Sequence, residues 1–276
     1  MHDEPGLAEM REYYERGGEA GRLDEPRGEL EFERTKEIIL RHLPPPAATV
    51  ADIGGGPGRY ALWLAGLGYH VLHRDMIPLH VEQLAEASGA DPRIRSAVAD
   101  ARRLDLADDS ADAVLLLGPL YHLGQRRDRL QALAEARRVL RAGGPVFAAA
   151  ISRWAARLDG ILRARVYETY PQAEAELAAI EATGRIPPLF PGSFCGYAHR
   201  PGQLRAELAT AGFQVIDLVS VEGAAFLLDD LGERLASPVS RRIVLTTARA
   251  VERVPELLGT GPHLLATAVA SPESPA

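Results

Sequence analysis

Hydrophobic residues in this chain fall into short apolar runs that alternate with longer amphipathic stretches. Apolar runs of strand length occur at 49–53, 70–73, 94–98, 113–117, 146–151, 213–221 and 263–269. Stretches with helical period lie between them, at 59–67, 78–87, 128–141, 201–211 and 241–258. Regular alternation of strands and helices is typical of βαβ units. The pattern therefore predicts an α/β fold with a doubly wound, mostly parallel, seven-stranded sheet.

Two segments interrupt this rhythm. Residues 1–45 are charged and have a helical period up to position 43, and three consecutive prolines at 44–46 break the pattern, which predicts an N-terminal helical segment. Residues 154–200 carry a helical pattern over 158–181 and then several prolines and glycines, which predicts a helical cap inserted above the sheet. The remaining residues, 46–153 and 201–270, should form the sheet domain. We expect 271–276 to be a disordered tail.

Composition narrows the classes of partner. The chain has 276 residues and a formal net charge of −7, which disfavours nucleic acid because DNA and RNA binding depends on clustered cations. No apolar run approaches the roughly 18 residues that span a bilayer, and residues 1–5 lack the features of a secretory signal. We therefore expect a cytoplasmic protein without a membrane partner. The sequence does not reveal the oligomeric state, and a homodimer is one possibility.

Metal and disulfide chemistry have little support in the sequence. The single cysteine, Cys195, cannot form an internal disulfide or a thiolate cluster. The eight histidines are scattered, without the i, i+4 spacing of a helical metal site. We expect no bound metal.

A glycine-rich turn is the most informative stretch. Residues 50–58 read Val-Ala-Asp-Ile-Gly-Gly-Gly-Pro-Gly and join a predicted strand to a predicted helix. Glycines allow close approach of a ligand, and the free N–H groups at a helix N-terminus favour an anionic group. A plain tight turn would give a similar pattern, so the stretch needs supporting signals.

Spacing separates the classes of nucleotide site. A dinucleotide fingerprint starting at Gly54 requires glycine at position 59, where Arg59 stands. A P-loop requires Gly-Lys-Ser/Thr, but Gly58 is followed by Arg59 and Tyr60. The remaining pattern is an acid, Asp52, followed by glycines at alternate positions.

This pattern resembles that of the class I S-adenosylmethionine-dependent methyltransferases. Asp75 lies 23 residues after Asp52, at the end of the second predicted strand, and is followed by Met76. Ala99-Asp100-Ala101 and the segments 110–114 and 140–144 are similar to further landmarks of that family, in the expected order. The resemblance covers roughly residues 49–151 and the terminal strands loosely.

The resemblance implies S-adenosylmethionine as cofactor and S-adenosylhomocysteine as product. Asp52 would brace the turn and face the amino group of the cofactor, and Asp75 would accept hydrogen bonds from its ribose hydroxyls. Asp100 would accept from the adenine amine, and the Ala101 backbone would contact the ring. The expected cofactor residues are Asp52, Gly54, Gly55, Gly56, Gly58, Asp75, Met76, Asp100, Ala101 and Leu117. Gly55 departs from the family, which often has Cys or Ser there.

The methyl acceptor should lie beyond the fourth predicted strand, because ligands gather at the carboxyl ends of strands in open α/β sheets. The residues there are Gly118-Pro119-Leu120-Tyr121-His122. Family members that methylate base amines often carry Asn/Asp-Pro-Pro-Tyr at this place, so Gly118 argues against a nucleobase acceptor. Metal-assisted transfer to a catechol is disfavoured, because residues 117–118 supply no carboxylate.

A hydroxyl acceptor must lose a proton, which favours a nearby base such as histidine. His122, with Tyr121 beside it, is the first candidate, and His199 is a second candidate base; helix-capping roles are the structural alternatives. His73 and His80 are expected to be structural. The candidates for substrate binding are Tyr14, Trp154, Arg200 and Glu222.

The sequence thus predicts transfer of a methyl group from S-adenosylmethionine to an O, N or C atom of a small molecule, for which a natural-product intermediate is one candidate. Two alternatives remain open. A protein or peptide methyltransferase would need an open acceptor cleft. A non-catalytic regulator that binds the same cofactor would show no turnover.

Overall fold

The computed structural model describes residues 7–188 and 194–270, so the expected disordered tail at 271–276 lies outside the described residues. Five parallel strands stand in the order β3-β2-β1-β4-β5, and β9 and then β8 continue the sheet from β5 in antiparallel pairing. The predicted doubly wound, mostly parallel sheet is confirmed. Its strands are β1 Thr49–Ile53, β2 His70–Asp75, β3 Ile94–Val98, β4 Ala113–Leu116, β5 Pro145–Ser152, β8 Phe213–Ser220 and β9 His263–Ala270.

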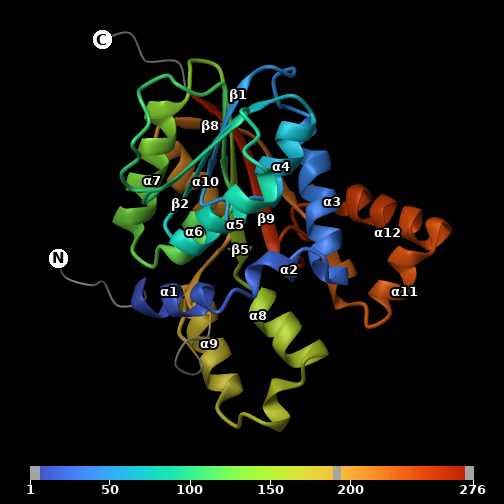
Figure 1. Ribbon diagram of the computed structural model, residues 1–276. Helices are drawn as coiled ribbons and strands as arrows, with labels where there is room; N and C mark the ends of the chain where they lie inside the picture. Colours follow the sequence, from blue (N-terminus) through green and yellow to red (C-terminus); the bar gives the residue numbers. More distant parts are fainter. Residues whose placement is uncertain (1–6, 189–193, 271–276) are drawn as a thin grey trace.

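Helices cover both faces of this sheet (Figure 1). On one face Val114 and Leu116 of β4 pack with α7 and α10, and on the other Ala113 and Leu115 join a cluster with α3, α4 and α5. All four residues of β4 are buried, as expected for a parallel strand with helices on both sides. The helices named here are α3 Pro26–Leu40, α4 Arg59–Gly66, α5 Pro78–Ser88, α7 Arg126–Val139 and α10 Pro201–Thr210.

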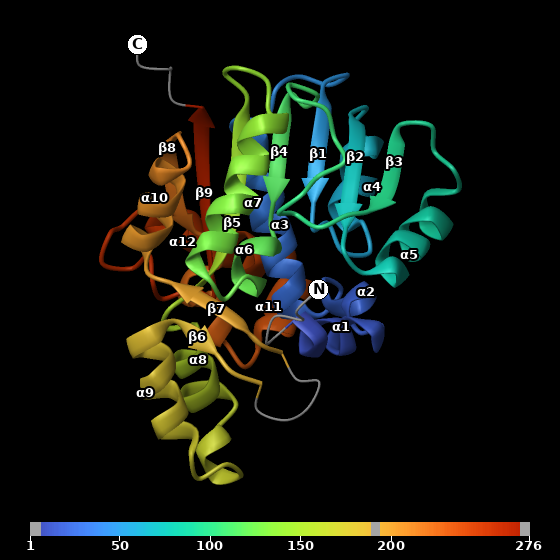
Figure 2. The same cartoon turned by 90° about the vertical axis from the view of Figure 1, so that its left-hand side faces the viewer.

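The carboxyl ends of the parallel strands point toward the N-terminal helices and the insertion (Figure 2). Two short N-terminal helices, α1 Leu7–Glu15 and α2 Glu19–Arg22, lie across this end of the sheet. A further short helix, α6 Pro119–His122, follows β4 and was not predicted. No helix among residues 7–188 and 194–270 is long and apolar enough to cross a membrane.

The insertion differs from the prediction in two ways. Its helical stretch is not continuous over 158–181, because Arg165 adopts a left-handed φ of 49° and the 170–172 turn contains Pro171, which cannot donate a backbone hydrogen bond. The observed elements are α8 Ala155–Arg157, η1 Leu158–Arg163, η2 Val166–Glu168 and α9 Ala173–Thr183. In addition, β6 Arg185–Ile186 and β7 Gly196–His199 form a hairpin, and β7 pairs in parallel with the end of β5.

The C-terminal helical region also differs from its predicted bounds. The predicted helix over 241–258 is α12 Pro238–Val251, which begins and ends earlier than expected. Two short helices that were not predicted, η3 Gly223–Leu227 and α11 Leu231–Ala236, precede it. Ser237 caps α12 through its side chain, and Pro238 occupies the first turn, where a missing N–H costs nothing. These capping signals place the helix start before the first strongly periodic residue.

An alanine at position 58 is expected to destabilise the fold by about 3 kcal/mol. Gly58 has a φ of +86°, and a Cβ there would lie 2.4 Å from Leu84 Cδ1 on α5. Urea denaturation measures the free energy of unfolding. Gly66→Ala is the matched control, because Gly66 lies in α4, the helix that Gly58 caps, with nothing within 4 Å of its added Cβ. Equal unfolding midpoints for Gly58→Ala and wild type would contradict the expectation.

Candidate active site

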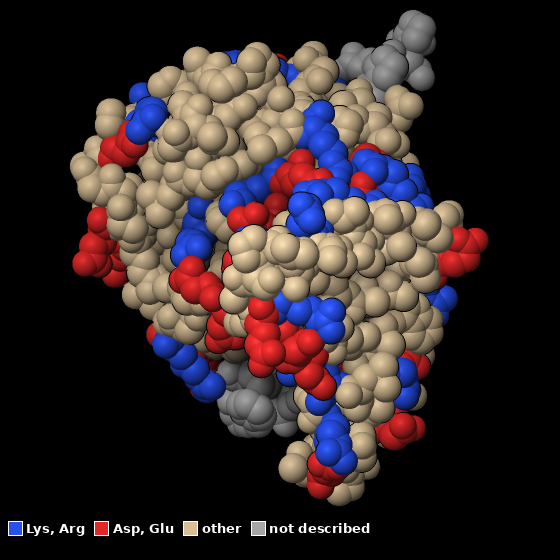
Figure 3. Space-filling model, turned by 90° about the vertical axis from the view of Figure 1, so that its right-hand side faces the viewer, with Lys and Arg blue, Asp and Glu red and all other residues tan. Residues whose placement is uncertain are grey.

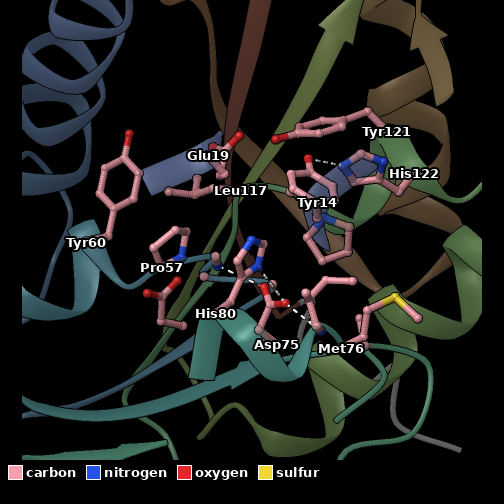
Figure 4. Close-up of a pocket in the computed structure, with 18 of the residues that line it drawn as sticks. Tyr14, Glu19, Pro57, Tyr60, Asp75, Met76, His80, Leu117, Tyr121 and His122 are labelled. Carbon is pink, nitrogen blue, oxygen red and sulfur yellow. Dashed lines mark hydrogen bonds and ion pairs between the residues drawn. The ribbon is translucent and has the colours of Figure 1, made fainter. Parts of the chain in front are cut away.

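A pocket of about 1040 Å³, part of it open to solvent, lies at the carboxyl ends of β1, β2 and β4. The glycine turn after β1 (residues 54–58), the start of α5, residues 99–101 and the segment 117–123 supply one part of its wall. Helices α1, α2 and α3 supply the other part, with Met10, Tyr14, Glu19, Arg22 and Glu31, and Leu23 adds to it directly after α2. Figure 4 shows Tyr14 and Glu19 in this wall. Segments far apart in the sequence therefore enclose one space.

Most of the expected cofactor residues meet in this pocket. Its lining contains Asp52, Gly54, Gly55, Gly56, Asp75, Met76, Asp100, Ala101 and Leu117, together with Tyr14, Tyr121 and His122. Gly58 is not in the lining but forms the N-cap of α4. Among the described residues of the insertion none lines the pocket, and the N-terminal helices supply its cover. From the insertion, the Phe194 ring packs against His122.

The surroundings of Gly55 account for glycine at this position, where the family often has Cys or Ser. A Cβ at this position would lie 2.5 Å from Asp52 Oδ2 and 2.6 Å from the His73 ring. The His73 ring is fixed by two contacts. Its Nε2 lies 3.0 Å from the Gly56 carbonyl oxygen, and its Nδ1 lies 2.8 Å from Ser96 Oγ. The structural role expected for His73 agrees with these contacts.

Asp52 is fully buried, and neither of its carboxylate oxygens has a hydrogen-bond partner among the described residues. Burial, with a smaller contribution from the charge of Asp75, raises the pKa of Asp52 to about 7. A buried carboxylate without a partner is costly. A cationic group that entered the pocket would supply the hydrogen bonds and the charge that this carboxylate lacks.

Asp75 lies at the end of β2 and already accepts three hydrogen bonds. Oδ2 accepts from the Gly56 N–H at 2.8 Å, and Oδ1 accepts from the Ile77 N–H at 2.9 Å and from His80 Nδ1 at 3.0 Å. Burial alone would raise the pKa of Asp75, but these bonds and the nearby His80 hold it below its ordinary value. A carboxylate offers about four acceptor positions, so one position remains, on Oδ2.

Asp100 and Ala101 form another edge of the pocket. The Asp100 carboxylate is held by Arg102, whose backbone N–H lies 2.9 Å from Oδ1 and whose Nη2 lies 2.8 Å from Oδ2. Burial alone would raise the pKa of Asp100, but the bonds to Arg102 lower it overall. An ionised acceptor is thus fixed where the adenine amine was expected.

Tyr14 and His122 connect the N-terminal cover to α6. The Tyr14 hydroxyl lies 2.8 Å from His122 Nε2, and the Phe194 ring packs 5.5 Å from the His122 ring. Burial lowers the pKa of His122 to about 4, and the charge of Asp75 offsets it only in part. His122 is therefore neutral near pH 7. Burial also raises the pKa of Tyr121, which keeps its hydroxyl protonated.

Arg22 organises a charged network at the other end of the pocket. Its guanidinium contacts Glu19 on α2 at 2.7 Å and both carboxylate oxygens of Glu31 on α3. Behind this wall, His263 Nδ1 lies 2.6 Å from Glu222 Oε1 and 3.9 Å from Glu31 Oε2. Burial would lower the pKa of His263, but the two carboxylates raise it to about 9. Glu222, a predicted substrate residue, thus lies behind the lining.

The donor atoms of Glu31, Glu222 and His263 lie within 4.8 Å of one another, a spacing that a cation could bridge. Arg22 already neutralises Glu31, and the protonated imidazole already pairs with Glu222. The cluster is balanced by protein charges.

The structure does not bring the other three candidates to the pocket. His199 is fully buried on β7, with Nε2 3.2 Å from Glu207, which also pairs with Arg129 at 2.7 Å. Arg200 caps α10, and Trp154 is 41% exposed beside β5. A structural role accounts for the contacts of His199.

Sequence reasoning missed several residues of the pocket wall. The polar members are Glu19, Arg22, Glu31, Arg59, Tyr60 and His80. A signal existed for His80, because it lies on the first turn of the helix that follows Asp75, at the same end of the sheet. The N-terminal residues carried no such signal, because their position depends on how α1 and α2 dock.

The sheet order and the acid-flanked glycine turn agree with those expected of S-adenosylmethionine-binding α/β proteins. Residues 51–148 match a family model described as a methyltransferase domain. The ubiquinone/menaquinone biosynthesis C-methyltransferase UbiE of Acidiphilium cryptum is 38% identical over 122 residues, which are 43% of this chain and 48% of that protein. The match thus spans about half the length of this curated relative. The chain is therefore similar to class I S-adenosylmethionine-dependent methyltransferases, and residues 51–148 carry that similarity.

Solved structures show the same fold at low sequence identity. A methyltransferase from Methanosarcina mazei aligns with a TM-score of 0.59 at 16% identity, over 86% of this chain and 98% of that one. The 1,6-didemethyltoxoflavin-N1-methyltransferase of Burkholderia thailandensis aligns with a TM-score of 0.57 at 16% identity, over 96% and 88%. The cyclase SpnF also aligns, with a TM-score of 0.55 at 17% identity, over 86% and 80%. Because a cyclase shares it, the fold alone does not fix the reaction.

S-adenosylmethionine, the cofactor of this class, fits the residues present. The unpartnered carboxylate of Asp52 suits its cationic amino group, and Asp75 keeps an acceptor position for the ribose. At position 55 a side chain would collide with Asp52, so glycine keeps the turn open to a ligand.

Proposed function

We propose that this protein transfers the methyl group of S-adenosylmethionine to an O, N or C atom of a small molecule. The observation that carries this proposal is a single pocket in which the expected cofactor residues adjoin a covered acceptor space. Tyr14 of α1 lines the pocket beside His122, and the Phe194 ring packs against His122, so aromatic side chains gather over the segment that follows β4. Such an arrangement suits an enclosed small molecule better than a polymer.

The cofactor supplies a methyl group that its sulfonium has already activated. The protein must align the acceptor, exclude water and take up any proton that the acceptor loses. Burial keeps His122 neutral, so its Nε2 can accept a proton. The Tyr14 hydroxyl can take the proton of the acceptor while it passes its own proton to His122 Nε2. A base with a pKa of about 4 is weak, and it therefore suits acceptors that lose a proton readily, such as phenols and enols. Tyr121 would position the acceptor from the same short helix.

The relatives support a small-molecule acceptor. UbiE takes its name from ubiquinone and menaquinone biosynthesis, and the Burkholderia structure holds 1,6-didemethyltoxoflavin with S-adenosylhomocysteine. A natural-product intermediate is our preferred substrate class.

The surface charge supports the same proposal. On the face shown in Figure 3, acidic and basic side chains are interspersed. Ion pairs between α12 and α3, such as Arg249 with Glu37 and Arg241 with Glu29, likewise join opposite charges. A nucleic acid would require an extended basic surface instead.

A protein or peptide acceptor is the second candidate. It needs an open cleft at Tyr121 and His122, and the cover formed by Tyr14 and Phe194 argues against it. A non-catalytic regulator would bind the cofactor equally well, so turnover must separate that alternative.

Titration calorimetry with S-adenosylhomocysteine, followed by incubation with S-adenosylmethionine and metabolite extract, tests the proposal. We expect micromolar binding and a product that is heavier than an extract component by one methylene, detected by mass spectrometry. Absence of binding would contradict the proposal. Binding without any methylated small molecule, while extract proteins gained methyl groups, would favour the peptide alternative.

A further inference from the structure

His80 has a buried nitrogen that the proposed reaction does not use. The residue is 2% exposed and lines the pocket from the first turn of α5. Its Nδ1 lies 3.0 Å from Asp75 Oδ1, and a carboxylate can only accept, so Nδ1 carries the proton. In the neutral ring the lone pair is therefore on Nε2. That atom is buried without a hydrogen-bond partner among the described residues.

The position of the His80 ring is fixed from two sides. Figure 4 shows the ring beside Asp75, with its opposite edge toward the space between Leu117 and Tyr14. The Tyr14 ring contacts it edge-on, at 5.2 Å between centroids. A fixed and unpaired acceptor that lines a pocket indicates a ligand donor.

Asp75 alone cannot serve both hydroxyls of a ribose in this structure. Its Oδ1 is already shared by the Ile77 N–H and His80, and its Oδ2 accepts from the Gly56 N–H. One acceptor position is left for a diol that presents two donors. The hydrogen bond between His80 and Asp75 puts a second acceptor, Nε2, next to the first.

We propose that the ribose diol of S-adenosylmethionine is held jointly, with one hydroxyl donating to Asp75 Oδ2 and the other to His80 Nε2. This inference rests on the proposed function, since it assigns a part of the same cofactor site. Other acceptors in the pocket suit other groups. The carboxylate of Asp52 suits a cation, and His122 Nε2 is taken by the Tyr14 hydroxyl. His80 is thus a cofactor-binding residue and not only a structural one.

Two substitutions separate the nitrogens of His80. In His80→Asn the amide can still donate to Asp75 but does not extend to the position of Nε2, whereas in His80→Gln a longer side chain reaches toward it. Calorimetry should show about tenfold weaker binding of S-adenosylhomocysteine to the Asn variant, the loss typical of one hydrogen bond. The Gln variant should bind within about threefold of wild type. His70→Gln, an exposed histidine on β2, is the control and should bind like wild type.

The 2′-deoxy and 3′-deoxy analogues of S-adenosylhomocysteine identify the hydroxyl concerned. One of the two analogues should bind to wild type about tenfold more weakly than S-adenosylhomocysteine does. His80→Asn should bind that analogue no more weakly than it binds S-adenosylhomocysteine. Wild-type affinity of His80→Asn for the parent ligand, or an equal loss for all three ligands, would overturn the inference. Failure of the wild-type protein to bind S-adenosylhomocysteine would instead contradict the proposed function.

A second measurement does not depend on the folding of a variant. In wild-type protein with ¹⁵N-labelled histidine, the Nε2 resonance of His80 should move when S-adenosylhomocysteine binds and should move less with one deoxy analogue. The same shift with all three ligands would count against the inference.

Discussion

Asparagine at position 75 is expected to weaken S-adenosylhomocysteine binding by about a hundredfold, because hydrogen bonds to a charged acceptor contribute about 1.5–3 kcal/mol. Asp75 accepts from three protein donors and has one acceptor position left, which we propose for the ribose. An amide has one oxygen and a donor group, so at least one protein donor would face an N–H. The substitution therefore disturbs both the ligand contact and the geometry of the turn.

Calorimetry on Asp75→Asn measures this loss directly. Asp230→Asn is the matched acid-to-amide control, because Asp230 pairs with Arg234 at an exposed helix start and should leave the affinity unchanged. Affinity of the Asp75 variant within threefold of wild type would show that the cofactor does not use this carboxylate.

The second large effect is expected at Asp52. With a pKa of about 7, this carboxyl is partly protonated in the free protein at neutral pH. A cationic amino group placed beside it favours the ionised form, so binding should release a proton and should tighten between pH 6 and 8. Asp52→Asn should weaken S-adenosylhomocysteine binding by about thirtyfold to a hundredfold and abolish the proton release. Calorimetry in buffers of different ionisation enthalpy measures both quantities.

The same shift fixes the sign of the effect on stability. The folded pKa of Asp52 is raised above its unfolded value near 4, so the unfolded chain releases the proton first as pH rises. The free protein should therefore lose stability between about pH 4 and 7, and Asp52→Asn should stabilise it at pH 8. The residue would then favour ligand binding at the expense of the stability of the free protein.

A truncated ligand is the control for the Asp52 prediction. 5′-Methylthioadenosine has the nucleoside and the sulfur but lacks the amino acid part, so wild type and Asp52→Asn should bind it equally. An equal loss for both ligands would mean that the substitution damages the turn in general.

The local parts of the site were predictable from the sequence. The buried run 49–53, the glycine turn and the acid that ends the next strand are close in sequence, and their geometry follows from the strand–turn–helix arrangement. Asp52 and Asp75 could therefore be placed before the structure was known. Their hydrogen-bond state could not, because it depends on the exact path of the turn and on His80.

Parts that depend on docking between distant segments were not predictable. Arg22 is held in the pocket wall by its contact with Glu31. Tyr14 is held there by its contact with His122, 108 positions away in the sequence. His199 was expected as a second candidate base, but it lies on β7 in the core, against Glu207. A four-residue strand in a segment rich in glycine and proline has too weak a pattern to reveal such a placement.

A crystal structure of the complex with S-adenosylhomocysteine tests the central claim most directly. The account predicts electron density across the glycine turn, with the ribose hydroxyls within hydrogen-bond distance of Asp75 and the amino group beside Asp52. An empty turn at saturating ligand, or a ligand bound elsewhere with both carboxylates unoccupied, would contradict it.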